Sequence, residues 1–327
     1  MTVTPRDGFS IEVHLPPDEL ARSLREEAAT GLTSPTKHLA PTWFYDERGC
    51  ELFEEITALP EYYPTRAERG ILEAHADDIV AACGADTLVE LGSGTSAKTR
   101  LLLDAFARAG LLTRFVPFDV AEATLRDAAG ALSAEYPGVE VHAVVGDFRQ
   151  HLELLPNGGR RLVVFLGGTI GNFRPEERKN LLATLAGTLS AGECFLVGTD
   201  LVKDPARLVA AYDDAAGVTA EFNRNVLNVL NGALGADFDV DGFEHVARYN
   251  EAEEWIEMWL RSRRQQRVRL AELGVAVVFE EGEGMLTEIS AKFRLETVHA
   301  ELRAAGLEPV ASWCDDAGDF ALTLARR

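Results

Sequence analysis

Between residues 86 and 200, short apolar runs alternate with amphipathic stretches of helical length. This alternation is typical of a parallel sheet whose strands are joined by crossover helices. It predicts a Rossmann-type, doubly wound α/β domain. The predicted strands are 87–91, 114–119, 139–145, 162–166 and 194–199, and the predicted helices are 97–109, 121–135 and 175–189.

The pattern changes after residue 202. Segments 205–217 and 219–230 have helical spacing, whereas 255–263, 266–273 and 275–279 interleave polar and apolar residues as antiparallel strands do. A helix (295–305) and a strand pair (308–313 and 320–325) close the chain. We therefore predict a Rossmann-type α/β domain with an inserted α+β accessory domain. The first domain comprises 62–201 and 292–327, and the second comprises 14–61 and 202–291.

Residues Thr65 to Glu68 have the spacing of a capping box, in which a threonine hydroxyl and a glutamate carboxylate satisfy the first amides of a helix. This motif predicts a helix that begins there and continues to about residue 83. The helix is expected to pack against the sheet.

Charge limits the classes of partner. The chain has 32 Lys and Arg against 53 Asp and Glu, a formal net charge of −21. Such a field repels nucleic-acid phosphates and anionic membranes, so a small molecule is the expected substrate. The amino terminus lacks the apolar core of a signal peptide, and no apolar run reaches the roughly 18 residues of a membrane span. We expect a cytoplasmic protein, and a monomer.

The cysteines and histidines give no metal-binding pattern. The four cysteines lie far apart without a Cys-x-x-Cys pair, and the seven histidines include no His-Glu-x-x-His motif. We therefore predict no metal site and no disulfide framework.

The strongest motif for a cofactor is Glu90-Leu-Gly92-Ser-Gly94, which follows a predicted strand and precedes a helix. Glycines at this point let backbone amides approach a nucleotide closely. Taken alone, the motif fits a nicotinamide cofactor, a methyl donor or a simple turn.

Acidic residues end the next two predicted strands. Asp119 can accept hydrogen bonds from ribose hydroxyls, which suits either cofactor. Asp147 precedes Phe148, and this pair suits adenine because the carboxylate accepts from the exocyclic amine while the ring packs on the base. The three strand ends together favour S-adenosylmethionine.

A glycine-rich loop, Gly167 to Asn172, follows the fourth predicted strand, at the sheet edge where ligands bind in open α/β proteins. It lacks the Asn/Asp-Pro-Pro-aromatic tetrad of methyltransferases that act on nucleic-acid amines. A turn capped by Asn172 is the alternative interpretation.

With these motifs in place, the chain closely resembles the histidine-specific N-alpha-methyltransferases of bacterial ergothioneine biosynthesis, which convert L-histidine to its trimethylbetaine, hercynine. The resemblance extends over nearly the whole sequence, and it implies a Rossmann-type class I methyltransferase domain with an inserted α+β substrate-binding domain. The stretches that carry it are Trp43-Phe-Tyr-Asp46, Leu59-Pro-Glu-Tyr-Tyr-Pro-Thr65, Glu90-Leu-Gly-Ser-Gly-Thr-Ser96, Gly167-Gly-Thr-Ile-Gly-Asn172, Tyr212-Asp-Asp-Ala-Ala-Gly217, Phe222-Asn-Arg-Asn225 and Thr287-Glu-Ile-Ser290.

The resemblance implies two sets of site residues. The methyl donor would be contacted by Gly92, Lys98, Asp119, Asp147 and Phe148. The amino-acid acceptor would be contacted by Tyr62, Asn172, Tyr212, Glu288 and Ser290. Asn172 and Tyr212 would hold its carboxylate and amine, and Glu288 and Ser290 its imidazole. Gly168 departs from the serine more often found in the family.

The residue chemistry of Glu288 and Ser290 is compatible with this role, because residues two apart in a strand face the same side and can bind one ring together. A solvent-facing polar pair is the alternative. Tyr45, Phe53, Tyr62 and Tyr212 are candidates for an aromatic cage around a methylated amine, although each could instead be a core residue.

Two other functions stay open on the residues alone. One is a methyltransferase of the same fold with another acceptor, such as tryptophan. A buried Glu288 would disfavour any acceptor that cannot donate a hydrogen bond to it. The other is a ligand-sensing protein that binds the cofactor without turnover. A nicotinamide-dependent oxidoreductase is the least supported hypothesis, because that function leaves Asp147 and Phe148 without a role.

Overall fold

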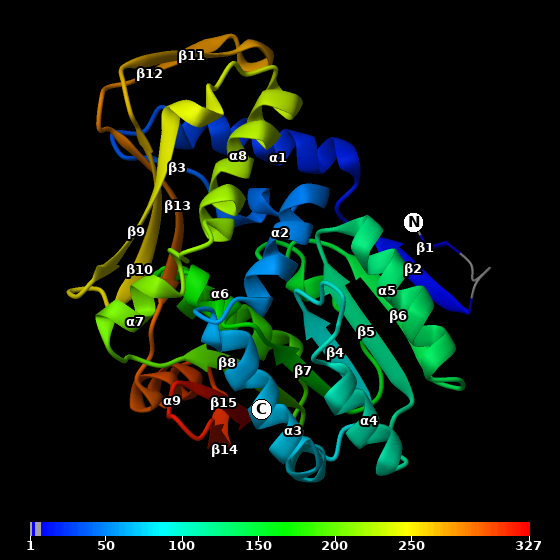
Figure 1. Ribbon diagram of the computed structural model, residues 1–327. Helices are drawn as coiled ribbons and strands as arrows, with labels where there is room; N and C mark the ends of the chain where they lie inside the picture. Colours follow the sequence, from blue (N-terminus) through cyan, green and yellow to red (C-terminus); the bar gives the residue numbers. More distant parts are fainter. Residues whose placement is uncertain (1, 4–7) are drawn as a thin grey trace. The chain divides into compact units, whose positions relative to one another are not determined.

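The computed structural model describes residues 2–3 and 8–327 and divides the chain into two compact units (Figure 1). Unit 1 comprises Met1–Leu15, Pro64–Val202 and Phe293–Arg327, and unit 2 comprises Pro16–Tyr63 and Lys203–Lys292. Tyr62, which the sequence assigned to the edge of the Rossmann domain, therefore belongs to unit 2.

Unit 1 is built on a nine-stranded sheet with the order β1-β2-β6-β5-β4-β7-β8-β15-β14. Strands β2 to β8 run parallel to one another, and β15 runs antiparallel to both of its neighbours. Its strands are β1 (Thr2–Val3), β2 (Phe9–Val13), β4 (Thr87–Leu91), β5 (Arg114–Asp119), β6 (Glu140–Val145), β7 (Arg161–Phe165), β8 (Cys194–Asp200), β14 (Glu308–Cys314) and β15 (Phe320–Arg326).

The strand order reverses between β4 and β7, the switch point where ligands bind in open α/β sheets. Every residue of β4, β7 and β8 is buried, because helices cover both faces and the strands are apolar throughout. The predicted Rossmann-type fold is confirmed. A single reversed strand, β15, inside a parallel set is the arrangement of class I methyltransferases.

Helices α3, α4 and α5 lie together in front of the sheet in Figure 1. Surface ion pairs connect them, from Arg108 to Asp77 and from Arg100 to Glu135. Helix α6 connects strands on the other side of β4, so right-handed crossovers put it on the opposite face. These helices are α3 (Tyr63–Cys83), α4 (Arg100–Arg108), α5 (Glu122–Glu135), α6 (Pro175–Thr188) and α9 (Leu295–Ala304).

Unit 2 contains a four-stranded sheet with the order β3-β13-β10-β9 and a separate two-stranded sheet of β11 and β12. Helix α8 packs on α2, β9 and β10 around an apolar core that includes Phe44, Leu227 and Met258. The elements are α1 (Pro17–Gly31), β3 (Lys37–His38), α2 (Glu47–Ala58), α7 (Pro205–Ala210), α8 (Val218–Leu234), β9 (Phe243–Asn250), β10 (Trp255–Ser262), β11 (Gln266–Leu270), β12 (Val275–Phe279) and β13 (Gly284–Ala291).

A buried carboxylate stabilises the sheet face opposite this core. Glu257 accepts hydrogen bonds from the indole nitrogens of Trp255 and Trp259, both at 2.9 Å, from Arg248 at 2.7 Å and from Asn250 at 3.0 Å. Burial alone would raise its pKa, but these four donors lower the pKa to about 2. The glutamate therefore remains charged and fully bonded.

The capping box predicted at Thr65 is wrong. Helix α3 begins at Tyr63, so Thr65 lies inside the helix, and the Glu68 side chain is buried with other partners. The sequence also gave no expectation for strands β2 and β9. The predicted strands 266–273 and 275–279 correspond to β11 and β12, which pair with each other and not with β10.

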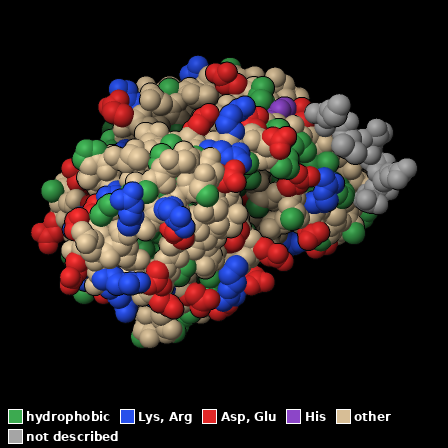
Figure 2. All heavy atoms as spheres, turned by 90° about the horizontal axis from the view of Figure 1, so that it is seen from above, with side chains coloured by type: hydrophobic (Ala, Val, Ile, Leu, Met, Phe, Trp, Pro, Cys, Tyr) green, Lys and Arg blue, Asp and Glu red, His purple; other side chains and the backbone are tan. Residues whose placement is uncertain are grey.

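Two further properties accompany the two-unit fold: the distribution of charged side chains and the hydropathy of the helices. The face in Figure 2 carries acidic and basic side chains intermixed. Within the described residues, no helix combines the length and apolar character needed to cross a bilayer.

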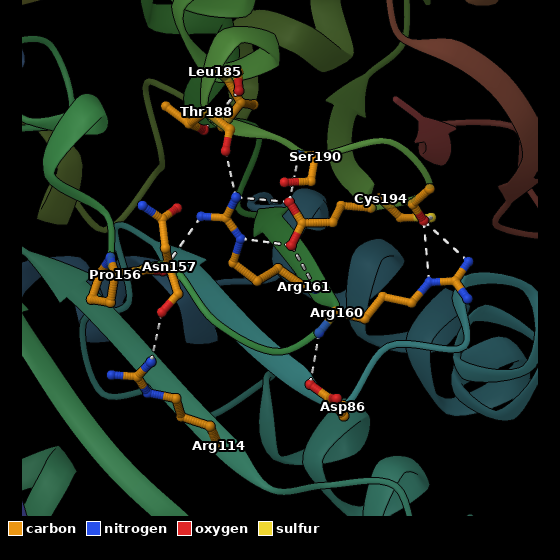
Figure 3. A network of polar contacts seen from close by, with 12 residues as sticks. Asp86, Arg114, Pro156, Asn157, Arg160, Arg161, Leu185, Thr188, Ser190 and Cys194 are labelled. Atoms are coloured by element: carbon orange, nitrogen blue, oxygen red, sulfur yellow. Dashed lines mark hydrogen bonds and ion pairs between the residues drawn. The ribbon is translucent and has the colours of Figure 1, made fainter.

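A buried ion pair joins the starts of two central strands (Figure 3). Arg161 on β7 and Glu193, just before β8, have side chains 1% and 6% exposed, and two nitrogens of the guanidinium contact both carboxylate oxygens at 2.8 and 2.7 Å. Glu193 also accepts from the amides of Arg161 and Ser190. Burial opposes ionisation of Glu193, but Arg161 and the amides together lower its pKa. The pair is satisfied on all sides.

Removing one partner should therefore leave a buried charge without compensation. We expect Glu193→Ala to lower the free energy of unfolding by about 3–5 kcal/mol. Glu308→Ala, which removes an exposed partner of Arg303, should change it by about 0–1 kcal/mol. Urea denaturation of both variants measures the difference, and equal losses would contradict the assigned role of burial.

Candidate active site

The glycine-rich loop after β4 is fixed by backbone bonds to the next strand. Gly92 and Gly94 have positive φ angles of 68° and 49°, which favour glycine. The amides of Gly92 and Ser93 donate to the Phe118 carbonyl at 2.8 and 3.1 Å, and the Gly94 amide donates to the Asp119 carboxylate at 2.8 Å. The loop and the acid at the end of β5 thus form one structure.

Asp119 lies half-buried at the end of β5. Its second oxygen accepts from the Ala121 amide at 2.9 Å. Burial raises the pKa of Asp119, and the amides of Ala121 and Gly94 offset part of that effect. A carboxylate has about four lone-pair sites, so Asp119 retains capacity to accept from ribose hydroxyls.

Asp147 and Phe148 follow β6 and approach the same loop. The Asp147 carboxylate accepts from the Arg149 amide at 2.8 Å, and the Asp147 amide donates to His151 Nδ1 at 3.0 Å. A Cβ atom placed on Gly92 would lie 3.7 Å from the Phe148 ring. The structure therefore brings Gly92, Asp119 and Phe148 together at the carboxyl ends of three adjacent strands.

Glu90, the last acid of β4, has a role that its sequence motif did not reveal. It is 4% exposed and accepts hydrogen bonds from the hydroxyls of Ser96, at 2.8 Å, and Thr99. Burial raises its pKa to about 7. Glu90 thus holds the far end of the glycine loop against the strand.

Lys98, which is expected near the methyl donor, forms an ion pair with the buried Glu68. Its ammonium binds the carboxylate of Glu68, which has no exposed surface. Both oxygens of Glu68 also accept from the Gly167 amide at 2.9 Å. A Cβ atom on Gly198 would overlap this carboxylate, so the glycine of β8 makes room for it. Glu68 therefore connects the glycine loop to the loop after β7.

The loop after β7 leads to Asn172. Gly167 and Gly168 have φ angles of 78° and 68°, followed by a short 3₁₀ helix, Thr169–Asn172, whose last residue is half-buried. At Gly168, where the family more often has serine, the left-handed backbone suits glycine. Asn172 thus stands in unit 1, at the same sheet edge as the cofactor residues.

The Ser93 hydroxyl gives independent support for a nucleotide-type ligand at the glycine loop of unit 1. The Ser93 hydroxyl in the glycine loop is buried and, among the described residues, has no hydrogen-bond partner. An unpaired buried hydroxyl costs about 1–3 kcal/mol, so a polar group bound at this loop would remove that cost.

Unit 2 holds the other acceptor residues, beginning with a series of aromatic rings. Tyr45 contacts Phe53 with ring centres 5.7 Å apart, Phe53 contacts Tyr62 at 6.3 Å, and Tyr62 contacts Tyr212 at 6.3 Å. The four residues considered for an aromatic cage therefore lie in one continuous series. Tyr62 and Tyr212 are also buried in the apolar core of unit 2, so these two rings serve in packing whether or not they contact a methylated ammonium group.

Tyr212 and Ser290 meet through their hydroxyls, 2.7 Å apart. The register of β13 with β10 opposes Ser290 to Ile256 and Glu288 to Met258. Both β10 residues belong to the apolar core, so Ser290 and Glu288 face the inner side of the sheet. The expectation that Glu288 and Ser290 share one face agrees with this pairing.

Several stretches that carry the family resemblance support the fold of unit 2. His245 Nε2 donates to the Tyr212 carbonyl at 2.7 Å, and His245 Nδ1 accepts from the Asn223 side-chain amide at 2.8 Å. The Asn223 carbonyl oxygen accepts from the Thr287 hydroxyl at 2.7 Å. Burial lowers the pKa of His245. A neutral imidazole with its Nε2 protonated satisfies both contacts, because it donates to the carbonyl and accepts from the amide.

Two further motifs of the resemblance contain aspartates that cap helices of unit 2. Asp46 caps α2 by accepting from the Gly49 amide at 2.8 Å, and the same carboxylate accepts from the Asn225 side chain at 2.7 Å. Asp214 caps α8 by accepting from the amides of Val218 and Thr219. These distinctive residues thus position elements, whereas Tyr62, Tyr212, Glu288 and Ser290 remain the candidates for acceptor binding.

The sequence matches a known protein family over most of its length. The model of the S-adenosylmethionine-dependent, histidine-specific methyltransferases matches residues 24–327. The chain belongs to this family.

Two relatives match almost end to end. The chain is 59% identical over 319 residues to the histidine N-alpha-methyltransferase of Mycolicibacterium smegmatis, covering 98% of this chain and 99% of that protein. It is 58% identical over 318 residues to that of Mycobacterium tuberculosis, covering 97% and 99%. Ergothioneine biosynthesis protein 1 of Schizosaccharomyces pombe is 32% identical over 255 residues, 74% of this chain and 32% of that protein. The resemblance found in the sequence is confirmed.

The family assignment also confirms the cofactor. The chain is a methyltransferase, and its methyl donor is S-adenosylmethionine.

The raised pKa of Glu90 predicts a pH effect on stability. The folded-state pKa of about 7 lies above the ordinary value of 4.5, so the stability linked to protonated Glu90 is complete below about pH 4.5 and is lost as the pH rises through 7. Glu90→Gln does not titrate. We expect the variant to gain about 3 kcal/mol relative to the parent protein between these pH values.

Chemical denaturation of both proteins at several pH values measures this difference. Other titrating groups are common to the two proteins and cancel. A difference in unfolding free energy that stays constant across the range would show that Glu90 is not protonated in the folded protein.

Proposed function

We propose that this protein transfers methyl groups from S-adenosylmethionine to the α-amine of L-histidine, three times in succession, to form hercynine in the first step of ergothioneine biosynthesis. The observation that carries the proposal is the match of nearly the whole chain to histidine N-alpha-methyltransferases at 58–59% identity. Relatives this similar over their full length generally keep the residues that define an acceptor.

The residues of unit 1 are suited to hold the donor. We assign Asp119 to the ribose hydroxyls, Asp147 and Phe148 to the adenine, and Gly92 and Lys98 to the amino-acid end of the cofactor. The cofactor supplies a methyl group on a sulfonium, which is already activated for displacement. The protein therefore has to align the amine with that methyl group and exclude water.

Two groups of residues are assigned to the acceptor, one to the carboxylate and amine of histidine and the other to its imidazole ring. We assign Asn172 and Tyr212 to the carboxylate and amine, and Glu288 and Ser290 to the imidazole. Tyr62, whose ring contacts Tyr212, is placed next to the amine. Its face can accommodate the positive charge that becomes permanent after the third transfer.

Proton removal makes a modest demand on the protein. An α-amine with an ordinary pKa of about 8 is partly neutral at cellular pH, and only this form has the lone pair that attacks the methyl group. The proton released at each of the first two transfers can pass to water. No dedicated strong base and no covalent enzyme intermediate are required.

The two alternatives from the sequence are not favoured. A tryptophan acceptor offers its indole N–H but no second ring nitrogen, whereas Glu288 and Ser290 present two polar groups on one sheet face. A sensing protein without turnover does not explain the full-length similarity to enzymes. The net charge of −21 further supports a small acceptor over nucleic acid or an anionic membrane, with the protein acting as a cytoplasmic monomer.

Product masses test the proposal directly. The protein is incubated with S-adenosylmethionine and each free amino acid in turn. We expect mass gains of one, two and three methyl groups with histidine and none with tryptophan. Equal methylation of several amino acids would contradict the specificity, and cofactor binding without methylation would favour the sensing role.

Asn172→Ala should separate acceptor binding from cofactor binding. Loss of an amide that bonds the substrate should raise KM for histidine by roughly tenfold or more. The dissociation constant for S-adenosylmethionine, measured by calorimetry, should stay within about twofold, because the side chain of Asn172 is assigned to the acceptor and not to the donor. Unchanged kinetics would remove Asn172 from the acceptor site.

A further inference from the structure

A buried lysine lies beside the proposed imidazole-binding residues. Lys292 is 4% exposed, and its ammonium donates to the Tyr212 hydroxyl at 3.0 Å and to the Ser290 hydroxyl at 2.9 Å. The ammonium is also 4.6 Å from the centre of the Tyr212 ring. With the 2.7 Å contact between Tyr212 and Ser290, the three polar groups form a closed triangle.

Hydrogen counting in this triangle limits what it can offer a ligand. Lys292 donates to both oxygens and accepts nothing, so one of the two hydroxyl hydrogens is used between Tyr212 and Ser290. An alkyl hydroxyl oxygen is a better acceptor than a phenol oxygen, which conjugates with its ring. The arrangement in which Tyr212 donates to Ser290 is therefore favoured over the reverse, and it leaves the Ser290 hydrogen for a ligand.

Glu288 supplies the opposite function on the same sheet face. Its carboxylate accepts hydrogen bonds, and it is two residues from Ser290 along β13. One donor and one acceptor match a neutral imidazole, which has one N–H and one bare nitrogen. The positive charge of Lys292 counters the Glu288 carboxylate, which by itself would favour an imidazolium.

We propose that Lys292 is a positioning residue that fixes the Ser290 hydroxyl as a donor to the bare ring nitrogen of the acceptor, so that the site selects a neutral imidazole. This inference rests on the proposed function, because it takes histidine to be the acceptor. Lys292 acts through Ser290 and contacts no reacting atom. A purely structural lysine would stabilise unit 2 without affecting which ring is bound.

A double-mutant cycle tests this coupling. The dissociation constant of histidine is measured by calorimetry with S-adenosylhomocysteine present, so that no methyl transfer occurs. We expect Lys292→Met to weaken histidine binding about tenfold in the parent protein, the size of one misdirected hydrogen bond. In the Ser290→Ala background the same change should cost less than about twofold, because the hydroxyl it orients is gone.

A ring analogue gives a second measurement that structural damage alone would not change. Pyrrol-2-ylalanine offers a ring N–H but no bare nitrogen. The parent protein should prefer histidine over this analogue by roughly tenfold or more, and Lys292→Met should reduce that preference several-fold. Lys37→Met is the matched control, since Lys37 is a mostly buried lysine of unit 2 paired with Glu283. Its preference should equal that of the parent.

Several results would overturn the proposal. These are histidine binding by Lys292→Met within about twofold of the parent, equal losses in both Ser290 backgrounds, or an unchanged preference over the analogue. Binding of S-adenosylhomocysteine and the melting temperature report folding of each variant, and Lys292→Gln replaces the methionine variant in the same cycle if that one does not fold. If the parent protein does not bind histidine at all, the proposed function fails before the role of Lys292 is reached.

Discussion

The carboxylate of Glu68 is the interaction on which the arrangement of unit 1 depends most. It has no exposed surface, and it bonds the Lys98 ammonium and the Gly167 amide at once. A buried carboxylate is costly unless it is paired and hydrogen-bonded, so its partners are held strongly in place. One partner follows the glycine loop and the other begins the loop to Asn172. The donor residues and Asn172 are therefore ordered together by one buried charge.

Buried carboxylates in this protein differ in protonation because their partners differ. Glu90 is bonded by two neutral hydroxyls, which do not offset the loss of water, and its pKa rises to about 7. Glu257 receives four donors, one of them a guanidinium, and its pKa falls to about 2. Local donors, and not depth alone, thus decide whether a buried acid is charged.

The sequence predicted the part of the fold that depends on local pattern. Apolar runs such as Thr87–Leu91 identify central strands because both of their faces are buried, and the acids that end β5 and β6 could be aligned at one sheet edge. Glu68 was misread because a spacing of three within a helix suits a cap equally well. Only the fold shows that Gly198 leaves room for this side chain. Partners that lie far apart in sequence have no local signal.

Lys292 was missed for a related reason. From sequence alone, a lysine at the end of a polar strand is expected to face solvent. Lys292 is instead buried against Tyr212, which lies eighty residues earlier in the chain. The resemblance identified Tyr212 and Ser290 individually, but hydroxyls can donate or accept, so their identity does not define the ligand they select. The ammonium fills one acceptor position on each oxygen, and a hydrogen bond from Tyr212 fills the second position on Ser290, so that the serine can only donate. In the proposed role of Lys292, specificity for a ring with one donor and one acceptor nitrogen thus depends on a third residue that need not touch the ring.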